Sequence, residues 1–204
     1  GVSIANNDDT PTAIDDTDFG SEDLLTGIQP QIFKIHNTGS GSLSLTGSPL
    51  VTLSGTHAGD FFVSAFPASS TIAAEDSVSF EISFDPTVAG IRTAVVSFEN
   101  DDSDEDPFTF HISGLGVASS EIDVLGNNQS ILNGDITPTH ADSTALDSTR
   151  QDYTSYVTYT IQNNGSADLF LTDVAPYVAI SGAHAADFTI VQAPTALITA
   201  GGGS

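Results

Sequence analysis

The chain has 204 residues, and its three basic residues against 27 acidic ones give a formal net charge of −24. A surface this acidic cannot neutralise phosphates, so nucleic-acid binding and charge-driven docking onto an anionic membrane are excluded. The absence of cysteine excludes disulfides, thiolate zinc sites and cysteine nucleophiles. No apolar run is long enough to cross a bilayer as a helix, so we expect no membrane insertion of this segment.

Apolar residues alternate with polar ones in short runs through the first half of the chain. The runs lie at residues 32–36, 77–84, 92–98 and 108–113. A period of two predicts β-strands, and the Gly, Pro, Asn and Asp residues between the runs mark turns. No stretch has the period of an amphipathic helix, so helix should be limited to single turns. We therefore expect an all-β fold of antiparallel β-sandwiches of the immunoglobulin-like kind.

Three sequence blocks occur twice in the same order. They pair residues 8–11 with 135–138, 35–45 with 161–171, and 55–61 with 182–188, at offsets of 126 or 127 residues. A nearly constant offset predicts a tandem repeat, with one immunoglobulin-like domain at residues 1–117 and a second at 118–204. The second copy stops about where residues 75–77 lie in the first. We therefore expect it to lack its C-terminal strands, through truncation or because another subunit completes it.

Several short motifs follow one another in the first copy. In chain order they are Asn37-Thr38-Gly39, Gly59-Asp60-Phe61, Phe84-Asp85-Pro86 and Ile112-Ser113-Gly114-Leu115-Gly116. This order resembles the bacterial surface repeats of choice-of-anchor D proteins, which are similar to the wider ASH/Hydin/MSP class of immunoglobulin-like modules. The second copy departs where Ala145-Leu146-Asp147 replaces Asp18-Phe19-Gly20. The resemblance implies a secreted, cell-attached, multidomain protein with immunoglobulin-like sandwiches and without catalytic activity.

The densest acidic cluster spans residues 100–106, between two predicted strands. Its carboxylates repel one another at close range, and Ca²⁺, which prefers several oxygen ligands, would relieve that repulsion. The candidate calcium ligands are Asp101, Asp102, Asp104 and Asp106. The cluster is not an EF-hand, because no glycine and no closing glutamate follow at the required positions. The alternative is an exposed, solvated hairpin tip whose charge discourages edge pairing.

A second acidic group recurs in both copies. Asp8 and Asp15 of the first copy correspond to Asp135 and Asp142 of the second. Asp135 and Asn127 stand near the junction of the copies, where a calcium ion would stiffen the connection. Capping of loops by the same side chains is the alternative.

Two histidines occupy equivalent places in the copies. His57 and His184 each stand three residues before the Asp-Phe pair that ends a repeated block, with no nucleophile or metal-ligand spacing beside them. We interpret both as turn residues rather than catalytic ones. Lys34, the single lysine, alternates outward on its predicted strand and is not expected to form an isopeptide cross-link.

The sequence presents no recognisable nucleophile, base and acid together, so we expect no catalytic residues and no enzyme activity. We expect an extracellular structural or adhesive module of a bacterial surface protein or filament, whose partners are neighbouring copies or adjacent repeats. Residues 2–8 resemble residues 96–102, so this segment would complete the second copy of another subunit by β-strand addition. The alternative is a carbohydrate-binding or accessory module of a larger secreted enzyme, with Tyr153 and Tyr156 facing surface glycans.

Overall fold

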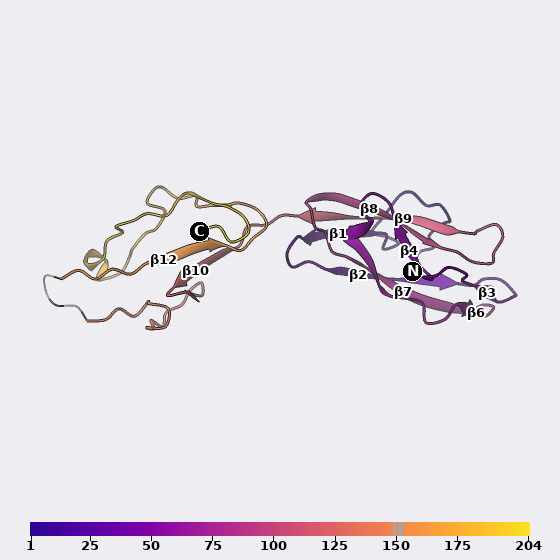
Figure 1. The fold of residues 1–204 in the computed structure, drawn as a ribbon, viewed down its shortest axis with the longest axis horizontal. Helices are drawn as coiled ribbons and strands as arrows, with labels where there is room; N and C mark the ends of the chain where they lie inside the picture. The colour runs from indigo at the N-terminus through magenta and orange to yellow at the C-terminus, as the bar shows by residue number, and fades with distance from the viewer. Residues whose placement is uncertain (149, 151–152) are drawn as a thin grey trace. The chain divides into compact units, whose positions relative to one another are not determined.

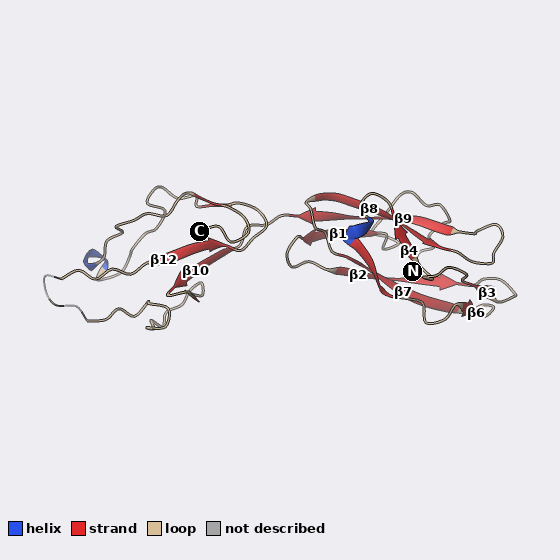
Figure 2. Cartoon of the chain, viewed as in Figure 1, coloured by secondary structure: helices blue, strands red, loops and turns tan. Residues whose placement is uncertain are grey.

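The computed structural model describes residues 1–148, 150 and 153–204. The chain divides into two compact units, Gly1–Ala118 and Ser119–Ser204, which we name unit 1 and unit 2. Across the described residues the regular structure is β-strand apart from two single 3₁₀ turns (Figures 1 and 2). The expected all-β fold and the limit on helix are therefore confirmed for this part of the chain.

Unit 1 contains two larger sheets and one small strand pair (Figure 1). The first sheet has the order β1-β9-β8-β4, formed by β1 (Asp18–Asp23), β4 (Thr52–Ser54), β8 (Gly90–Phe98) and β9 (Phe108–Val117). The second has the order β2-β7-β5, formed by β2 (Gln29–His36), β5 (Phe61–Ala65) and β7 (Ser77–Phe84). The small pair joins β3 (Leu43–Ser44) and β6 (Thr71–Ile72).

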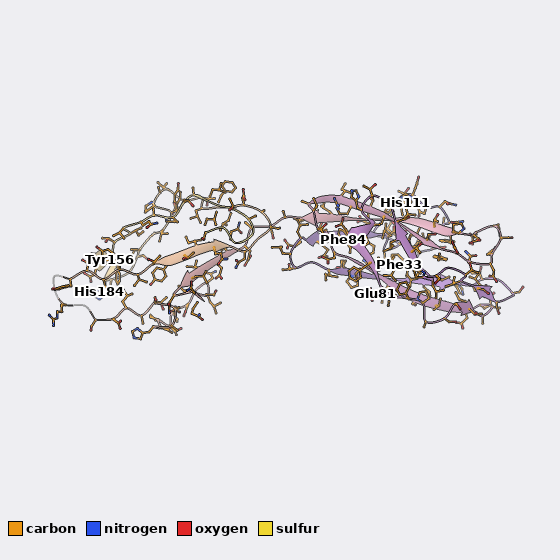
Figure 3. All side chains as sticks on the ribbon, viewed as in Figure 1. Phe33, Glu81, Phe84, His111, Tyr156 and His184 are labelled. Carbon is orange, nitrogen blue, oxygen red and sulfur yellow. The ribbon has the colours of Figure 1, made fainter. Side chains whose placement is uncertain are left out.

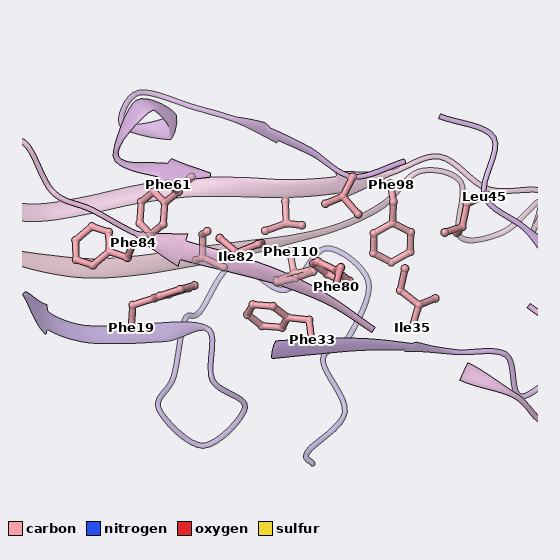
Figure 4. Packing of buried hydrophobic residues seen from close by; sticks show 14 of the residues in the cluster. Phe19, Phe33, Ile35, Leu45, Phe61, Phe80, Ile82, Phe84, Phe98 and Phe110 are labelled. Carbon is pink, nitrogen blue, oxygen red and sulfur yellow. The ribbon is translucent and has the colours of Figure 1, made fainter. Parts of the chain in front are cut away.

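The apolar faces of these sheets meet in a core rich in phenylalanine (Figure 4). In β2, Phe33 and Ile35 are buried while Ile32 and Lys34 are exposed, as the alternation predicted. Phe33 stacks on Phe80 of β7 with ring centroids 5.4 Å apart. Aromatic pairs of this kind stabilise a fold by about 0.5–1.5 kcal/mol beyond the burial of their area.

Strand β1 runs parallel to β9, so the expectation of a purely antiparallel sandwich is wrong at this pair. The pairing runs from Asp18 opposite Ser113 to Asp23 opposite Val117. Sequence alternation missed β1 because Phe19 is its one fully buried side chain and polar residues surround it. The strand forms because β9 offers it an edge, not because of its own pattern. The first and last strands of unit 1 thus lie side by side and point the same way.

The segment before β1 also pairs with β9. Asn7 N donates to Thr109 O at 2.7 Å, and His111 N donates to Asp8 O at 2.8 Å. Ile4 packs against the core of unit 1. We expected the segment at residues 2–8 to add as a strand to another subunit. In the structure it hydrogen-bonds to β9 and packs against the core of its own unit.

Unit 2 is less regular than unit 1. Its three-stranded sheet has the order β11-β10-β12, formed by β10 (Ile122–Gly126), β11 (Gln129–Ser130) and β12 (Tyr159–Asn163). A second pair joins β13 (Leu169–Phe170) and β14 (Leu197–Ile198). Among the large apolar side chains described in unit 2, Ile198 is the one that is buried. The described part of unit 2 therefore buries far fewer apolar side chains than unit 1 does.

Asn37 of unit 1 and Asn163 of unit 2 make the same hydrogen bonds. Asn37 Nδ2 donates to Ile72 O at 3.0 Å, and Asn163 Nδ2 donates to Ile198 O at 3.1 Å. In each case the Oδ1 accepts the backbone N–H of the glycine two residues later, at 3.0 Å. Both asparagines are buried and join the end of one strand to a second strand 35 residues further on.

The two 3₁₀ turns are also alike. They are η1 (Ala58–Asp60) and η2 (Ala185–Asp187). His57 precedes the first with φ −116° and ψ 23°, and His184 precedes the second with φ −117° and ψ 24°. Both histidines therefore occupy turns, as the sequence predicted, in one shared local geometry.

Candidate functional site

The acidic loop at residues 100–106 joins β8 to β9 and is held by its own side chains. Asp101 Oδ1 accepts a hydrogen bond from Ser44 N at 2.7 Å, and Asp106 Oδ1 accepts one from Asn100 N at 3.0 Å. Asn100 is buried, and its Oδ1 accepts a bond from Asp102 N at 2.8 Å. Two of the four candidate calcium ligands in this loop therefore already accept backbone hydrogen bonds.

The pKa values of two carboxyl groups in the loop shift in opposite directions. Hydrogen bonds from Ser44 hold the pKa of Asp101 below its ordinary value. A hydrogen bond shared with Asp104 raises the pKa of Asp102, and the charges of Asp104 and Asp101 act in the same direction. Repulsion between close carboxylates disfavours the charged form, which is the direction of the shift at Asp102.

The acidic residues that recur in both units cap loops in the same way. Asp15 Oδ1 accepts hydrogen bonds from Thr17 Oγ1 at 2.6 Å and Thr12 Oγ1 at 2.8 Å. Its counterpart Asp142 accepts one from Thr144 Oγ1 at 2.6 Å. Burial alone would raise the pKa of Asp15, but the bonds from Thr17 and Thr12 outweigh it and lower that pKa. The same kind of bond from Thr144 lowers the pKa of Asp142.

Asp8 and Asp135 form a second matched pair of caps. Asp8 Oδ1 accepts a bond from Thr10 N at 3.0 Å, and Asp135 Oδ1 accepts one from Thr137 N at 2.8 Å. Side-chain and backbone hydrogen bonds from Thr137 lower the pKa of Asp135. These are the loop-capping roles that the sequence offered as the alternative to calcium binding.

Asn127 lies in the two-residue turn between β10 and β11. Its φ is 50° and that of Asn128 is 58°, the left-handed pair that a tight hairpin turn requires. Asn127 Nδ2 donates to Ala141 O at 3.1 Å. Within residues 1–148, 150 and 153–204, no three His, Asp or Glu side chains are placed together to hold a metal ion. Calcium binding at these positions stays a prediction.

The most enclosed charged group in unit 1 is Asp60, which the sequence did not single out as a site. Asp60 Oδ2 accepts a hydrogen bond from Arg92 Nε at 2.7 Å. Its Oδ1 accepts bonds from Thr87 N at 2.9 Å and Thr87 Oγ1 at 2.7 Å. Burial would raise the pKa of Asp60, but these bonds from Thr87 and Arg92 lower it. The alternation of the sequence already indicated this site, because Arg92 lies on the same face of β8 as the buried Ala94. A charged side chain on that face requires a partner of opposite charge.

His57 contributes a further contact to the same end of unit 1. Its Nδ1 accepts a hydrogen bond from Thr93 N at 3.1 Å. The same nitrogen lies 3.3 Å from Thr93 Oγ1, so His57 joins the turn to β8.

Surface hollows are present in both units. One of about 200 Å³ in unit 1 is lined by short polar and proline side chains around Ser48 and Glu99. The other, about 460 Å³ in unit 2, lies between Tyr159, Ile180, His184 and Phe188. His184, which is labelled in Figure 3, lines the second hollow.

A scan against protein-family models finds no match, and a search of curated proteins finds no relative. Among solved structures, the chain is similar to a protein of unknown function from Porphyromonas gingivalis W83, with 20% identity, a TM-score of 0.40, and coverage of 48% of this chain and 42% of that one. It is similar to the secreted serine protease VesC from Vibrio cholerae, with 12% identity, a TM-score of 0.40, and coverage of 51% and 22%. It is also similar to an ASH/PapD-like domain of human CEP192, with 16% identity, a TM-score of 0.32, and coverage of 48% and 80%. The chain thus spans less than half of the first two proteins.

No helix in the described part of the chain is long and apolar enough to cross a membrane.

Proposed function

We propose that the chain is a non-catalytic structural or adhesive module of a bacterial surface protein or filament, built from tandem immunoglobulin-like repeats and placed outside the cell. Unit 1 is the complete module and unit 2 is a second copy. The shared asparagine bonds, threonine-capped aspartates and 3₁₀ turns of the two units support the repeat. The acidic loops keep such a module soluble and charged.

The observation that carries a structural role is the parallel pairing of β1 with β9. Tension along the chain pulls the start of β1 and the end of β9 in opposite directions. Because the two strands are parallel neighbours, this force slides one along the other and loads all their hydrogen bonds together. An antiparallel terminal pair would instead open one bond at a time. Unit 1 is therefore arranged to resist pulling through its ends.

Single-molecule pulling on the full chain tests this role, and the lack of native cysteine makes engineered attachment points unique. Handles on Ser3→Cys and Ala118→Cys load β1 and β9 in shear. Handles on Ser3→Cys and Ser103→Cys pull from the same end of both strands and peel them apart. We expect the unfolding force in shear to be several-fold higher than in peeling. Equal forces in the two directions would contradict a load-bearing module.

A second candidate is a carbohydrate-binding or accessory module of a larger secreted enzyme. The exposure of Tyr153 and Tyr156, at 70% and 73%, favours it. Exposed aromatic rings stack on sugar rings. Glycan-array binding that is lost in Tyr153→Ala and kept in Tyr177→Ala would support this candidate, and the absence of any glycan binding would remove it.

A further inference from the structure

Two separate pieces of chain lie along one edge of β9. The first is the short segment around Asp8, which pairs with Phe110 in the parallel sense. The second is β1, which starts with Asp18 opposite Ser113 and is also parallel. The partners Phe110 and Ser113 are three positions apart on β9, whereas Asp8 and Asp18 are ten positions apart. The chain between the two pieces therefore leaves the strand edge and returns to it as a loop, residues 9–17.

Hydrogen bonds close this loop across its neck. Asp18 N donates to Thr12 O at 3.0 Å, and Thr12 N donates to Thr17 Oγ1 at 2.8 Å. The buried Thr17 donates in turn from Oγ1 to Asp15 Oδ1 at 2.6 Å. The tip is open to solvent, with Ile14 77% exposed. The loop is therefore a closed length of chain, and none of its residues belongs to the apolar core of unit 1.

The same closure occurs in unit 2. Thr139 N donates to Thr144 Oγ1 at 2.8 Å, and Ala145 N donates to Thr139 O at 2.8 Å. The tips of the two loops differ, because Ala141 stands where unit 1 has Ile14. The closed neck thus belongs to the repeated module, whereas the tip does not.

The two pieces are held on β9 by unequal pairings. Backbone hydrogen bonds hold Asn7 and Asp8 on β9 at 2.7 and 2.8 Å, and Asn6 Oδ1 accepts a bond from Thr109 N at 2.9 Å. Strand β1 pairs with β9 at four positions and also buries Phe19 in the core. A load along the strands is shared by the bonds of each pairing, so the shorter pairing yields at a lower force than β1 does.

We propose that residues 6–8 and the loop at 9–17 form a length reserve in the load path of unit 1. Tension from the N-terminal side of Asn7 first lifts this segment from β9 and opens the loop, while β1 stays paired and the core stays closed. The chain from Asn7 to Asp18 spans about 37 Å when extended, but its anchors on β9 are only about 13 Å apart, so opening releases roughly 25 Å. Such local opening precedes global unfolding wherever a segment has few buried apolar contacts. The proposal rests on the load-bearing role of unit 1.

Single-molecule pulling on the full chain with handles on Ser3→Cys and Ala118→Cys tests the reserve, and it keeps unit 2 outside the load path. We expect two extension events, a first of roughly 25 Å at the lower force and a second that unfolds the core. Handles on Asp18→Cys and Ala118→Cys are the matched comparison, because pulling from Asp18 bypasses the loop. The first event should then be absent. A single event with the handle on Ser3→Cys, or a first event that persists with the handle on Asp18→Cys, overturns the proposal.

Lengthening the loop identifies the source of the first event. Five glycines inserted between Ala13 and Ile14, at the exposed tip, should lengthen the first event by about 17 Å and leave the second unchanged. The same insertion between Ser103 and Asp104, in the exposed loop that joins β8 to β9, should lengthen the second event only. Insertions at exposed loop tips are well tolerated in folding, so both variants stay measurable. An insertion after Ala13 that does not lengthen the first event overturns the proposal.

The load-bearing role is judged by a different quantity, the force of the second event in shear against that in peeling. A high shear force without a first event overturns the length reserve alone. Equal forces in shear and in peeling, with the first event present, overturn the load-bearing role on which the reserve rests.

Discussion

Asp60 and Arg92 form the central ion pair of unit 1, with Arg92 Nε 2.7 Å from Asp60 Oδ2 and 16% and 5% of the two side chains exposed. The pair joins the 3₁₀ turn η1, which follows β4, to strand β8, which starts at Gly90. Thr87 N and Thr87 Oγ1 donate hydrogen bonds to the other carboxylate oxygen of Asp60. A buried carboxylate is tolerated only when its oxygens are satisfied in this way. In unit 2, His184 Nδ1 lies 3.9 Å from Asp187 Oδ2, and this contact is an ion pair only when the imidazole is protonated.

Replacing Asp60 by Asn should destabilise unit 1 by about 3 kcal/mol at pH 7, because Arg92 keeps a buried charge without its partner. The pKa of Asp60 is lower in the folded protein than its ordinary value of 3.8. Its contribution to stability is therefore complete above that value and is lost as the pH falls through the lower folded pKa. Urea unfolding from pH 7 to pH 2 should show the two proteins converging at the acid end. Asp85→Asn, at an exposed position of the same connection, is the control, and a loss equal to that of Asp60→Asn would contradict the role of the ion pair.

Asn37→Ala should destabilise unit 1 by about 2 kcal/mol, because it leaves buried carbonyls without a donor. Asn37 Nδ2 donates to Gly41 O, Ile72 O and Ala73 O, at 2.8, 3.0 and 3.1 Å. Asn163→Ala should lower the stability of unit 2 for the same reason, read from tyrosine fluorescence. If either variant melts like the unchanged chain, the shared bonds of the two asparagines are not what holds these strands.

Gly114→Ala should destabilise unit 1 by about 1–3 kcal/mol, because a Cβ at Gly114 would overlap the ring of Phe84. Phe84→Leu should recover part of this loss when combined with Gly114→Ala, since the two positions are in contact. Gly41→Ala is the control, because a Cβ there meets no other atom. Additive losses in the double variant would show that the ring and the glycine are not coupled. Thermal unfolding of the single and double variants measures all four effects.

Calcium binding by the loop at residues 100–106 predicts that a chelator lowers the melting temperature of unit 1. The variant Asp102→Asn with Asp104→Asn should remove that difference, because it removes the paired carboxylates that face each other. Asp101 and Asp106 should be left unchanged in this test, since Asp101 accepts a hydrogen bond from Ser44 N of β3 and Asp106 accepts one from Asn100 N of the loop. A melting temperature that EDTA does not move would exclude calcium as a stabilising ligand of this loop.

The all-β class and the inward face of each long strand follow from sequence alone. Phe33, Ile35, Phe80 and Ile82 are buried as their period of two predicted, because alternation fixes which side chains face a core whatever the strand pairs with. The offset between copies likewise located the equivalent asparagines and turns.

Other features were decided by tertiary structure. Strand β1 has almost no apolar pattern and exists through its pairing with β9. Neighbouring threonines donate hydrogen bonds to the Oδ1 atoms of Asp15 and Asp142, a geometry that sequence spacing does not reveal. The net charge of −24 excludes nucleic-acid binding, but which carboxylates are buried, capped or open depends on what packs against them. Asp60 stands in a block of sequence that recurs at Asp187, and only the tertiary structure brings Arg92, 32 residues further along the chain, beside Asp60.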